Sequence, residues 1–290
     1  MKTCTVIELS VFSQKNGGGN LCSLVLNGVE LTSQEMQTIA SLASYSETVF
    51  IVESKVADIG LRFFMPNQET PLCGHGTIGA ISYLSSQLEA ERQHWHIETQ
   101  AGILEATFNK QAQTVTMSQS PAMFKPYQED IAELCQVLGI QPQDLDPTLP
   151  VVYGSTGVWT LIVPVKKLAS LAKMLPQTQD FPKVLQGRKD ISIHPFTKGE
   201  TSDYVARHFS SYASGIIEDP VTGTASGVMA AYLLVYGDDP KVQRGINIEQ
   251  GVALKELGKV TAQANYLNQQ IDVKVKGETT YKRKFNLSFY

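Results

Sequence analysis

The chain has 290 residues, of which 42% are hydrophobic and 18% charged, and its formal net charge is −4. This length suits two ordinary domains or one large one, and the composition is that of a chain able to bury a core. The negative charge argues against a nucleic-acid binder, because such binding relies on many cationic contacts to phosphate.

No apolar run is long enough to cross a bilayer, since the longest, Val228–Tyr236, is far shorter than the roughly 20 residues of a spanning helix. The N-terminus alternates like a strand and lacks the apolar block of a signal peptide. The four cysteines form neither a disulfide framework nor a zinc-type pair. We therefore expect a soluble cytoplasmic protein with reduced thiols and with no membrane or nucleic-acid partner.

Strands dominate the first half of the predicted structure. Thr32 and Glu35 form a capping box that starts a helix, and a second helix, rich in small residues, is expected at Gly76–Leu88. A domain boundary is expected at Pro121–Pro126. The strands of this half are expected at Cys4–Phe12, Leu21–Leu26, Glu47–Val52, Leu61–Phe64, His94–Glu98, Ile103–Phe108 and Thr114–Met117.

The second half mixes helices and strands. Helices are expected at Gln128–Leu138, where Gly139 stops the helix, at Lys166–Leu175, and at Ala225–Tyr236, which is again rich in small residues. The expected strands are Val151–Val165, Lys189–His194, Asp203–Phe209, Ile246–Ile248, Gly258–Ala262, Ile271–Lys276 and Lys284–Phe289.

A short internal repeat links the two halves. Pro71–Thr77 matches Pro220–Ser226 about half the chain later, and each copy precedes a helix of small residues. An Arg-x-Phe strand stands upstream of each copy, at Arg62 and at Arg207. Matches in the same order favour two halves built on one plan.

Each copy of the repeat can form an anion site. A glycine lets the backbone approach a ligand, and a helix start offers unpaired N–H groups with partial positive charge. Two such starts could hold a small carboxylate. The alternative is structural, because glycines also allow a helix and a sheet to pack closely.

A nucleotide site is a second interpretation of the first copy. Gly74-x-Gly76-x-x-Gly79 fits the dinucleotide fingerprint, and Glu98 follows at a suitable distance. The context is poor, because Pro66–Pro71 separates the preceding strand from the first glycine. This interpretation would make the protein a nicotinamide-dependent oxidoreductase.

Reactive side chains gather around the repeat. Cys73 stands at a predicted helix start, where a thiol can become acidic, although its counterpart Thr222 cannot share that role. His75 could donate to a carboxylate or move a proton, and Asp219 could cap a helix or accept from a substrate amine. Glu47, between a helix and a strand, would ordinarily be solvated. No metal is expected, because His94 and His96 lack further ligands at recognisable spacing.

Five motifs occurring in order resemble the PhzF-like family and, more distantly, diaminopimelate epimerase. They are Val11-Phe12-Ser13 with Gly19-Asn20, Ser46-Glu47-Thr48, Arg62–Pro66 leading to Cys73–Thr77, Gly215–Gly227, and Gln250-Gly251. The resemblance implies an α+β fold with two pseudo-twofold-related domains, each a β-sheet or barrel rolled around a central helix. The domains would be 1–120 with a returning strand at 282–290, and 121–281, with the active site in the cleft between them.

The resemblance also implies a cofactor-independent isomerase or epimerase, acting on a small anionic metabolite and assembling as a homodimer. Glu47 would be the general acid/base, with His75 and Asp219 as further catalytic residues. A non-catalytic protein that binds small carboxylates is the remaining alternative. The implied substrate-binding residues are Cys73, Gly74, Gly76, Thr222, Gly223 and Thr224.

Overall fold

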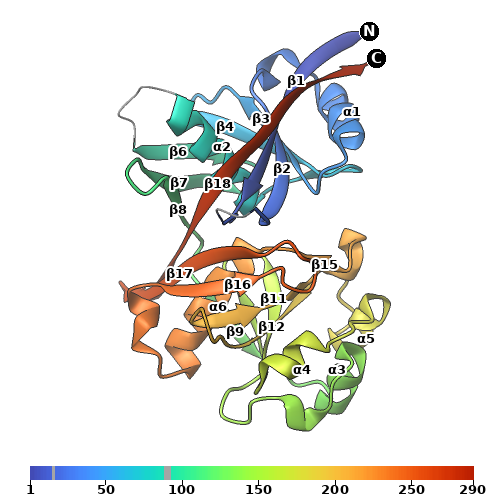
Figure 1. The fold of residues 1–290 in the computed structure, drawn as a ribbon, viewed down its shortest axis with the longest axis vertical. Helices are drawn as coiled ribbons and strands as arrows, with labels where there is room; N and C mark the ends of the chain where they lie inside the picture. The colour runs from blue at the N-terminus through green and yellow to red at the C-terminus, as the bar shows by residue number, and fades with distance from the viewer. Residues whose placement is uncertain (15–16, 88–92) are drawn as a thin grey trace. The chain divides into compact units, whose positions relative to one another are not determined.

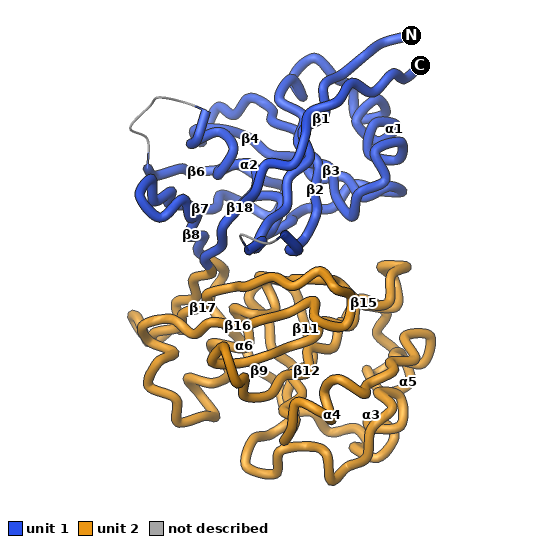
Figure 2. Tube along the Cα trace, in the orientation of Figure 1, with its two compact units in different colours: residues 1–118, 276–290 blue, residues 119–275 orange. Residues whose placement is uncertain are grey.

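The computed structural model describes residues 1–14, 17–87 and 93–290 and divides into two compact units (Figure 2). Unit 1 comprises residues 1–118 and 276–290, and unit 2 comprises residues 119–275. The chain therefore returns to unit 1 six residues earlier than the 282 expected from the sequence. The reason is that a single strand, β18 (Gln270–Phe289), runs from unit 2 into unit 1, where two separate strands were expected (Figure 1).

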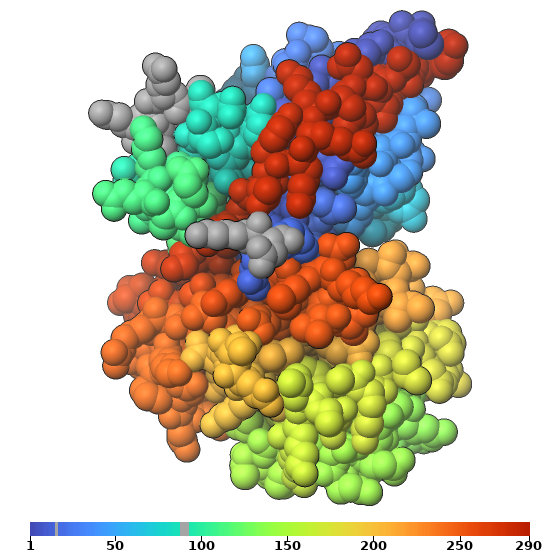
Figure 3. All heavy atoms as spheres, viewed as in Figure 1, coloured from blue at the N-terminus to red at the C-terminus, as the bar shows by residue number. Residues whose placement is uncertain are grey.

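The strands of unit 1 close into a barrel. Going round it, β1 pairs with β2, then β3, β4, β6, β7, β8 and β18 follow, and β18 pairs again with β1. Figure 3 shows β18, in red, lying along the N-terminal strand on the surface of this unit. The strands are β1 (Lys2–Val11), β2 (Asn20–Val25), β3 (Thr48–Val52), β4 (Ile59–Phe64), β6 (His94–Thr99), β7 (Gly102–Asn109) and β8 (Thr114–Ser118), with a short β5 (Glu69–Thr70) paired to β4.

The predicted capping box opens the outer helix of unit 1, α1 (Ser33–Ala43). Thr32 Oγ1 accepts from the Glu35 amide at 3.3 Å, and Glu35 Oε2 accepts from the Thr32 amide at 2.8 Å. Because these two bonds satisfy N–H groups that a helix start leaves unpaired, the helix begins where the sequence placed it. Met36 and Ile39 then bury the apolar face against the barrel.

A second helix, α2 (Gly74–Gln87), occupies the inside of the barrel, where it contacts β1, β2, β3, β7 and β8. It was expected at Gly76–Leu88, and residue 88 lies outside the described residues. A side chain at Gly76 would meet Val49 Cγ2 at 2.7 Å, and one at Gly79 would meet Val11 Cγ2 at 3.0 Å. The small residues are thus required because the strands approach the helix closely.

The dinucleotide interpretation is wrong for this fold. Gly74, Gly76 and Gly79 all lie within α2, whereas the fingerprint needs its first glycine in a tight turn directly after a strand. The sheet around α2 is a closed barrel with mixed strand directions, not the parallel sheet of a dinucleotide fold. The glycine spacing reflects the packing of the helix inside the barrel.

Unit 2 repeats this plan around α6 (Gly223–Tyr236). From β10 onward its strand pairs are antiparallel, parallel, antiparallel, parallel and antiparallel, the order found from β1 onward in unit 1. The strands are β9 (Met123–Pro126), β10 (Val152–Ser155), β11 (Trp159–Pro164), β12 (Ser192–Lys198), β13 (Tyr204–Ala206), β14 (His208–Phe209), β15 (Glu218–Asp219), β16 (Ile246–Gln250) and β17 (Gly258–Leu267).

Each unit is therefore a sheet rolled around a central helix, as the resemblance implied, and the pseudo-twofold relation stays a prediction. The expected boundary at Pro121–Pro126 is largely a strand, β9, which pairs with β10 inside unit 2. Three smaller helices, α3 (Ile131–Leu138), α4 (Leu168–Ala172) and α5 (Phe181–Val184), contribute to the separate core of this unit. Among the described residues, no helix has the length and apolarity needed to span a membrane.

An arginine–glutamate pair precedes the central helix of each unit. Arg62 bonds both carboxylate oxygens of Glu69, at 2.7 and 2.8 Å, and Arg207 bonds both of Glu218, at 3.0 and 2.6 Å. In unit 1 the pair joins β4 to the short strand β5, and in unit 2 it joins Arg207, between β13 and β14, to the short strand β15; β5 and β15 each precede a central helix. The repeated arginines thus have a structural role, because a two-pronged bond fixes the loop that delivers the helix start.

Two histidines form a buried pair in unit 2. The Nδ1 atoms of His194, on β12, and His208, on β14, lie 3.3 Å apart. Burial lowers the pKa of His208 to about 4, and burial together with the neighbouring imidazole holds the pKa of His194 well below its usual value. Both rings are therefore neutral in the folded protein near neutral pH.

This pair predicts a loss of stability in mild acid. Between about pH 6.5 and pH 4 the two histidines are protonated in the unfolded chain but stay neutral in the folded protein. The free energy of unfolding therefore falls as pH falls. The slope reaches about 1.4 kcal/mol per pH unit for each histidine. Urea unfolding between pH 7 and pH 5 measures it. The exposed His94→Gln change should leave the slope unaltered and His208→Phe should reduce it, so a flat profile in the native protein would refute the prediction.

Candidate active site

Three side chains of unit 1 meet at the start of α2. Glu47 Oε2 lies 3.3 Å from His75 Nε2, and Cys73 Sγ lies 3.6 Å from Nδ1 and 3.9 Å from Nε2 of the same ring. Cys73 is buried, and the side chains of His75 and Glu47 are only 10% and 19% exposed. The fold thus joins a carboxylate, an imidazole and a thiol in one sheltered cluster.

Glu47 comes from a segment distant in sequence from α2. It stands immediately before β3, and its carbonyl accepts the Ser23 amide of β2 at 3.1 Å. Its Oε2 atom is shielded from solvent yet makes no hydrogen bond, because the contact with His75 lacks hydrogen-bond geometry. Burial, and secondarily the nearby charge of Glu47, raise the pKa of the Cys22 thiol. Because its Oε2 atom has no hydrogen-bond donor, Glu47 keeps that oxygen available to accept a proton.

Cys73 caps the central helix. Its sulfur accepts the Gly76 amide at 3.3 Å, and its carbonyl accepts the Thr77 amide at 3.0 Å and the Thr77 hydroxyl at 2.8 Å. The sulfur takes the place of the oxygen that serine or threonine usually provides at a helix start. This capping role places the thiol beside His75.

The start of α6 is organised differently. Thr222 is the cap residue, but its hydroxyl donates to an Asp219 carboxylate oxygen instead of capping the helix. Its amide donates to Gln250 Oε1 at 3.1 Å, and Gln250 Nε2 donates to Ser226 Oγ at 2.7 Å. Gln250 is completely buried. The motif residue Gln250 thus holds this helix start in place, a role that sequence reasoning missed.

The predicted substrate-binding residues differ in whether their backbone amides already donate a hydrogen bond within the protein. Gly76 and Thr222 already donate their amides, to Cys73 and Gln250. Gly74, Gly223 and Thr224 lie in the first turns of α2 and α6, where amides have no partner within the helix. Backbone anion binding is therefore best expected at those three positions.

Histidines at other positions do not join the cluster. His96 is 59% exposed and lies 3.5 Å from Asp58, on the outside of the barrel. Among residues 1–14, 17–87 and 93–290, the one set of three metal-ligating side chains close together is Glu47, Cys73 and His75, whose donor atoms all lie within 4.8 Å of one another. The sequence did not reveal this set, because Glu47 approaches the other two only through folding.

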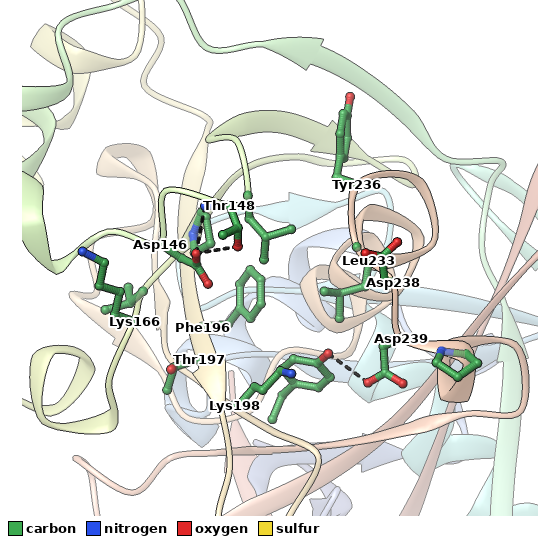
Figure 4. Close-up of a pocket in the computed structure, with 16 residues that line it drawn as sticks. Asp146, Thr148, Lys166, Phe196, Thr197, Lys198, Leu233, Tyr236, Asp238 and Asp239 are labelled. Atoms are coloured by element: carbon green, nitrogen blue, oxygen red, sulfur yellow. Dashed lines mark hydrogen bonds between the residues drawn. The ribbon is translucent and has the colours of Figure 1, made fainter.

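A separate pocket of about 530 Å³ lies at the C-terminal end of α6 (Figure 4). Two of its acidic groups are bonded within the protein: Asp239 accepts from Tyr204 at 3.0 Å, and Asp146 accepts from the amide of Thr148 at 2.9 Å. None of the predicted site residues lines it. This pocket is therefore separate from the cluster of Glu47, Cys73 and His75 in unit 1.

Comparisons with known proteins identify the class of enzyme. The chain is 42% identical over 288 residues to the uncharacterized isomerase YfhB of Bacillus subtilis, covering 97% of both chains. It is 28% identical over 252 residues to the trans-2,3-dihydro-3-hydroxyanthranilate isomerase of Pseudomonas chlororaphis, covering 86% of each. The fold and these relatives define the protein as an isomerase.

The family follows from a match over nearly the whole chain. Residues 9–284 match the family described as phenazine biosynthesis-like protein, PhzC-PhzF. A crystal structure of a Bacillus anthracis phenazine biosynthesis protein of the PhzF family has a TM-score of 0.94 and 39% identity, covering all of both chains. The chain belongs to the PhzF family, which confirms the resemblance.

The Gln250 network predicts a local cost in stability. Gln250→Leu removes the partner of the Thr222 amide, and a buried polar group left unpaired costs about 1–3 kcal/mol, whereas the Ser226 hydroxyl keeps its bond to the Thr222 carbonyl. Urea unfolding should show a loss in this range. Gln263→Leu, which removes an exposed bond to the Gln243 carbonyl, is the control and should cost no more than about 0.5 kcal/mol. Equal effects of the two changes would contradict a special role for Gln250.

Proposed function

We propose that this isomerase moves a proton between two carbons of a small carboxylate-bearing metabolite, with Glu47 as the general acid/base. The observation that carries the proposal is the Oε2 atom of Glu47, which is shielded from water, makes no hydrogen bond and lies 3.3 Å from His75 Nε2. A sheltered carboxylate without a competing donor is suited to accept a proton from carbon.

The reaction would proceed in two balanced steps. Glu47 takes a proton from a carbon made acidic by neighbouring unsaturation or by the carboxylate, and the electron pair left behind spreads into that system. Glu47 or His75 then returns a proton at a second carbon. The first-turn amides of α2 face the developing negative charge as fixed dipoles, which lowers the barrier without reorganisation.

Polar groups of unit 2 belong to the same proposal. Asp219 and the first-turn amides of Gly223 and Thr224 would bind the amine and carboxylate of the substrate. Cys73 would contact the substrate and hold His75 in place. The proton transfer needs only these side chains and backbone dipoles, so the proposal includes no organic cofactor.

The substrate class is proposed from the site and from one relative. Helix-start amides favour a carboxylate, and the Pseudomonas chlororaphis enzyme is named for an anthranilate derivative. We therefore propose small, unsaturated cyclic carboxylates as substrates, and trans-2,3-dihydro-3-hydroxyanthranilate is the first compound to test.

Incorporation of deuterium tests the mechanism. In deuterated water, the native protein should place deuterium on carbon in a turned-over substrate, measured by mass spectrometry across a set of cyclic carboxylates. Glu47→Gln removes the acid/base group and should slow exchange by roughly 10²–10⁴-fold. Glu105→Gln, a matched change at a side chain that is 72% exposed, should exchange at the native rate.

Two outcomes would overturn the proposal. Full exchange in Glu47→Gln would remove Glu47 from the acid/base role. Binding of a carboxylate by the native protein without any exchange would indicate a binding protein. Asp219→Asn tests unit 2 separately and should raise KM, because it weakens the proposed contact with the substrate amine.

A further inference from the structure

We infer that Glu47, Cys73 and His75 form a zinc-binding site, and that zinc bound there blocks the reaction. The site itself is read from the geometry of unit 1, and only the inhibition rests on the proposed function. The three donor atoms lie within 4.8 Å of one another, and the three residues are buried or half-buried.

The donor atoms lie close enough for one small tetrahedral metal ion to gather them. With zinc bonds of about 2.0–2.3 Å to oxygen, nitrogen and sulfur, neighbouring ligand atoms lie roughly 3.3–3.6 Å apart. His75 Nε2 lies 3.3 Å from Glu47 Oε2 and 3.9 Å from Cys73 Sγ. Nε2 can therefore be shared with Glu47 around one ion, but Cys73 Sγ lies closer to Nδ1, at 3.6 Å, so the thiol or the ring must rotate to bring the sulfur to that ion.

An independent observation points to a ligand at this place. Glu47 Oε2 is shielded from solvent and has no hydrogen-bond partner. A shielded carboxylate oxygen gains from an electropositive partner, because an unmade hydrogen bond costs about 1–3 kcal/mol. A metal ion between Glu47 and His75 would supply that partner.

The donor types select the metal. A thiolate, an imidazole and a carboxylate suit Zn²⁺, whereas Mg²⁺ and Ca²⁺ prefer oxygen ligands alone. Three protein ligands leave a fourth position for water or for a substrate carboxylate. As the metal–sulfur bond forms, the Cys73 thiol releases its proton to solvent, so binding tightens as pH rises.

Zinc would inhibit proton transfer because it would bind the Oε2 atom of Glu47. The oxygen that would accept the substrate proton is the oxygen that would bind zinc. Zinc and proton transfer therefore exclude each other, and a chelator should restore the reaction. The cluster would then make the enzyme responsive to free zinc.

Cobalt is the probe for the site, because Co²⁺ bound to a thiolate gives a near-ultraviolet charge-transfer band. The native protein should develop this band at one equivalent, and Zn²⁺ should abolish it by displacement. Cys73→Ser should lose the band while remaining folded, since serine also caps a helix well. Glu47→Gln and His75→Gln should weaken Co²⁺ binding by more than the roughly 10–100-fold that outer-shell changes cost.

Matched variants control for other thiols and imidazoles. Cys135→Ser removes a buried thiol of unit 2, and His96→Gln removes an exposed imidazole near two carboxylates. Both should keep the band. Cys22→Ser tests the buried thiol whose pKa is raised in part by Glu47, and it too should keep the band.

The inference is overturned if the native protein shows no band, if Cys73→Ser retains it, or if Cys22→Ser abolishes it. X-ray absorption at the zinc edge gives a second measurement, and a first shell without one sulfur atom would also overturn the inference. These readouts do not depend on turnover. Exchange that survives Glu47→Gln would refute the proposed function alone, whereas a missing cobalt band would refute the zinc site alone.

Discussion

Enclosing a helix within a sheet rolled around it is the constraint on which each unit depends. Except at its C-terminal end, the helix has no solvated face, so most of its residues are apolar or small on every side. Where the strands come closest, glycine is required: a side chain at Gly227 of α6 would meet Val273 Cγ1 of β18 at 2.9 Å, and one at Gly76 of α2 would meet Val49 Cγ2 of β3 at 2.7 Å. The same enclosure fixes the position of the helix start.

That fixed helix start determines the chemistry available. In unit 1 the cap is a thiol, and the turn that it closes carries His75 toward Glu47. In unit 2 the corresponding threonine donates its hydroxyl to Asp219, and Gln250 accepts from the amide of that threonine. The two units thus share one fold but have different polar networks. At the same position, the Cys73 sulfur accepts from a helix amide, whereas the Thr222 hydroxyl donates to Asp219.

Much of the local structure could be predicted from the sequence. The capping box at Thr32, the glycine stop at Gly139 and the two helices of small residues occur as expected, because their causes lie within a few residues. The length of β18 was wrong, because its polar, alternating sequence reads as two strands with a gap. Its pairing with β1, a strand from the other end of the chain, keeps it continuous.

In the candidate site, too, some features follow from the local sequence and others depend on the tertiary structure. Cys73, His75 and the glycines of the repeat are adjacent in sequence, so their position at a helix start follows from local signals alone. The approach of Glu47 to His75, the burial of its oxygen and the hold of Gln250 on Thr222 arise only in the folded barrel. The physical reason is that these contacts join segments brought together by strand pairing and closure, which no local pattern encodes.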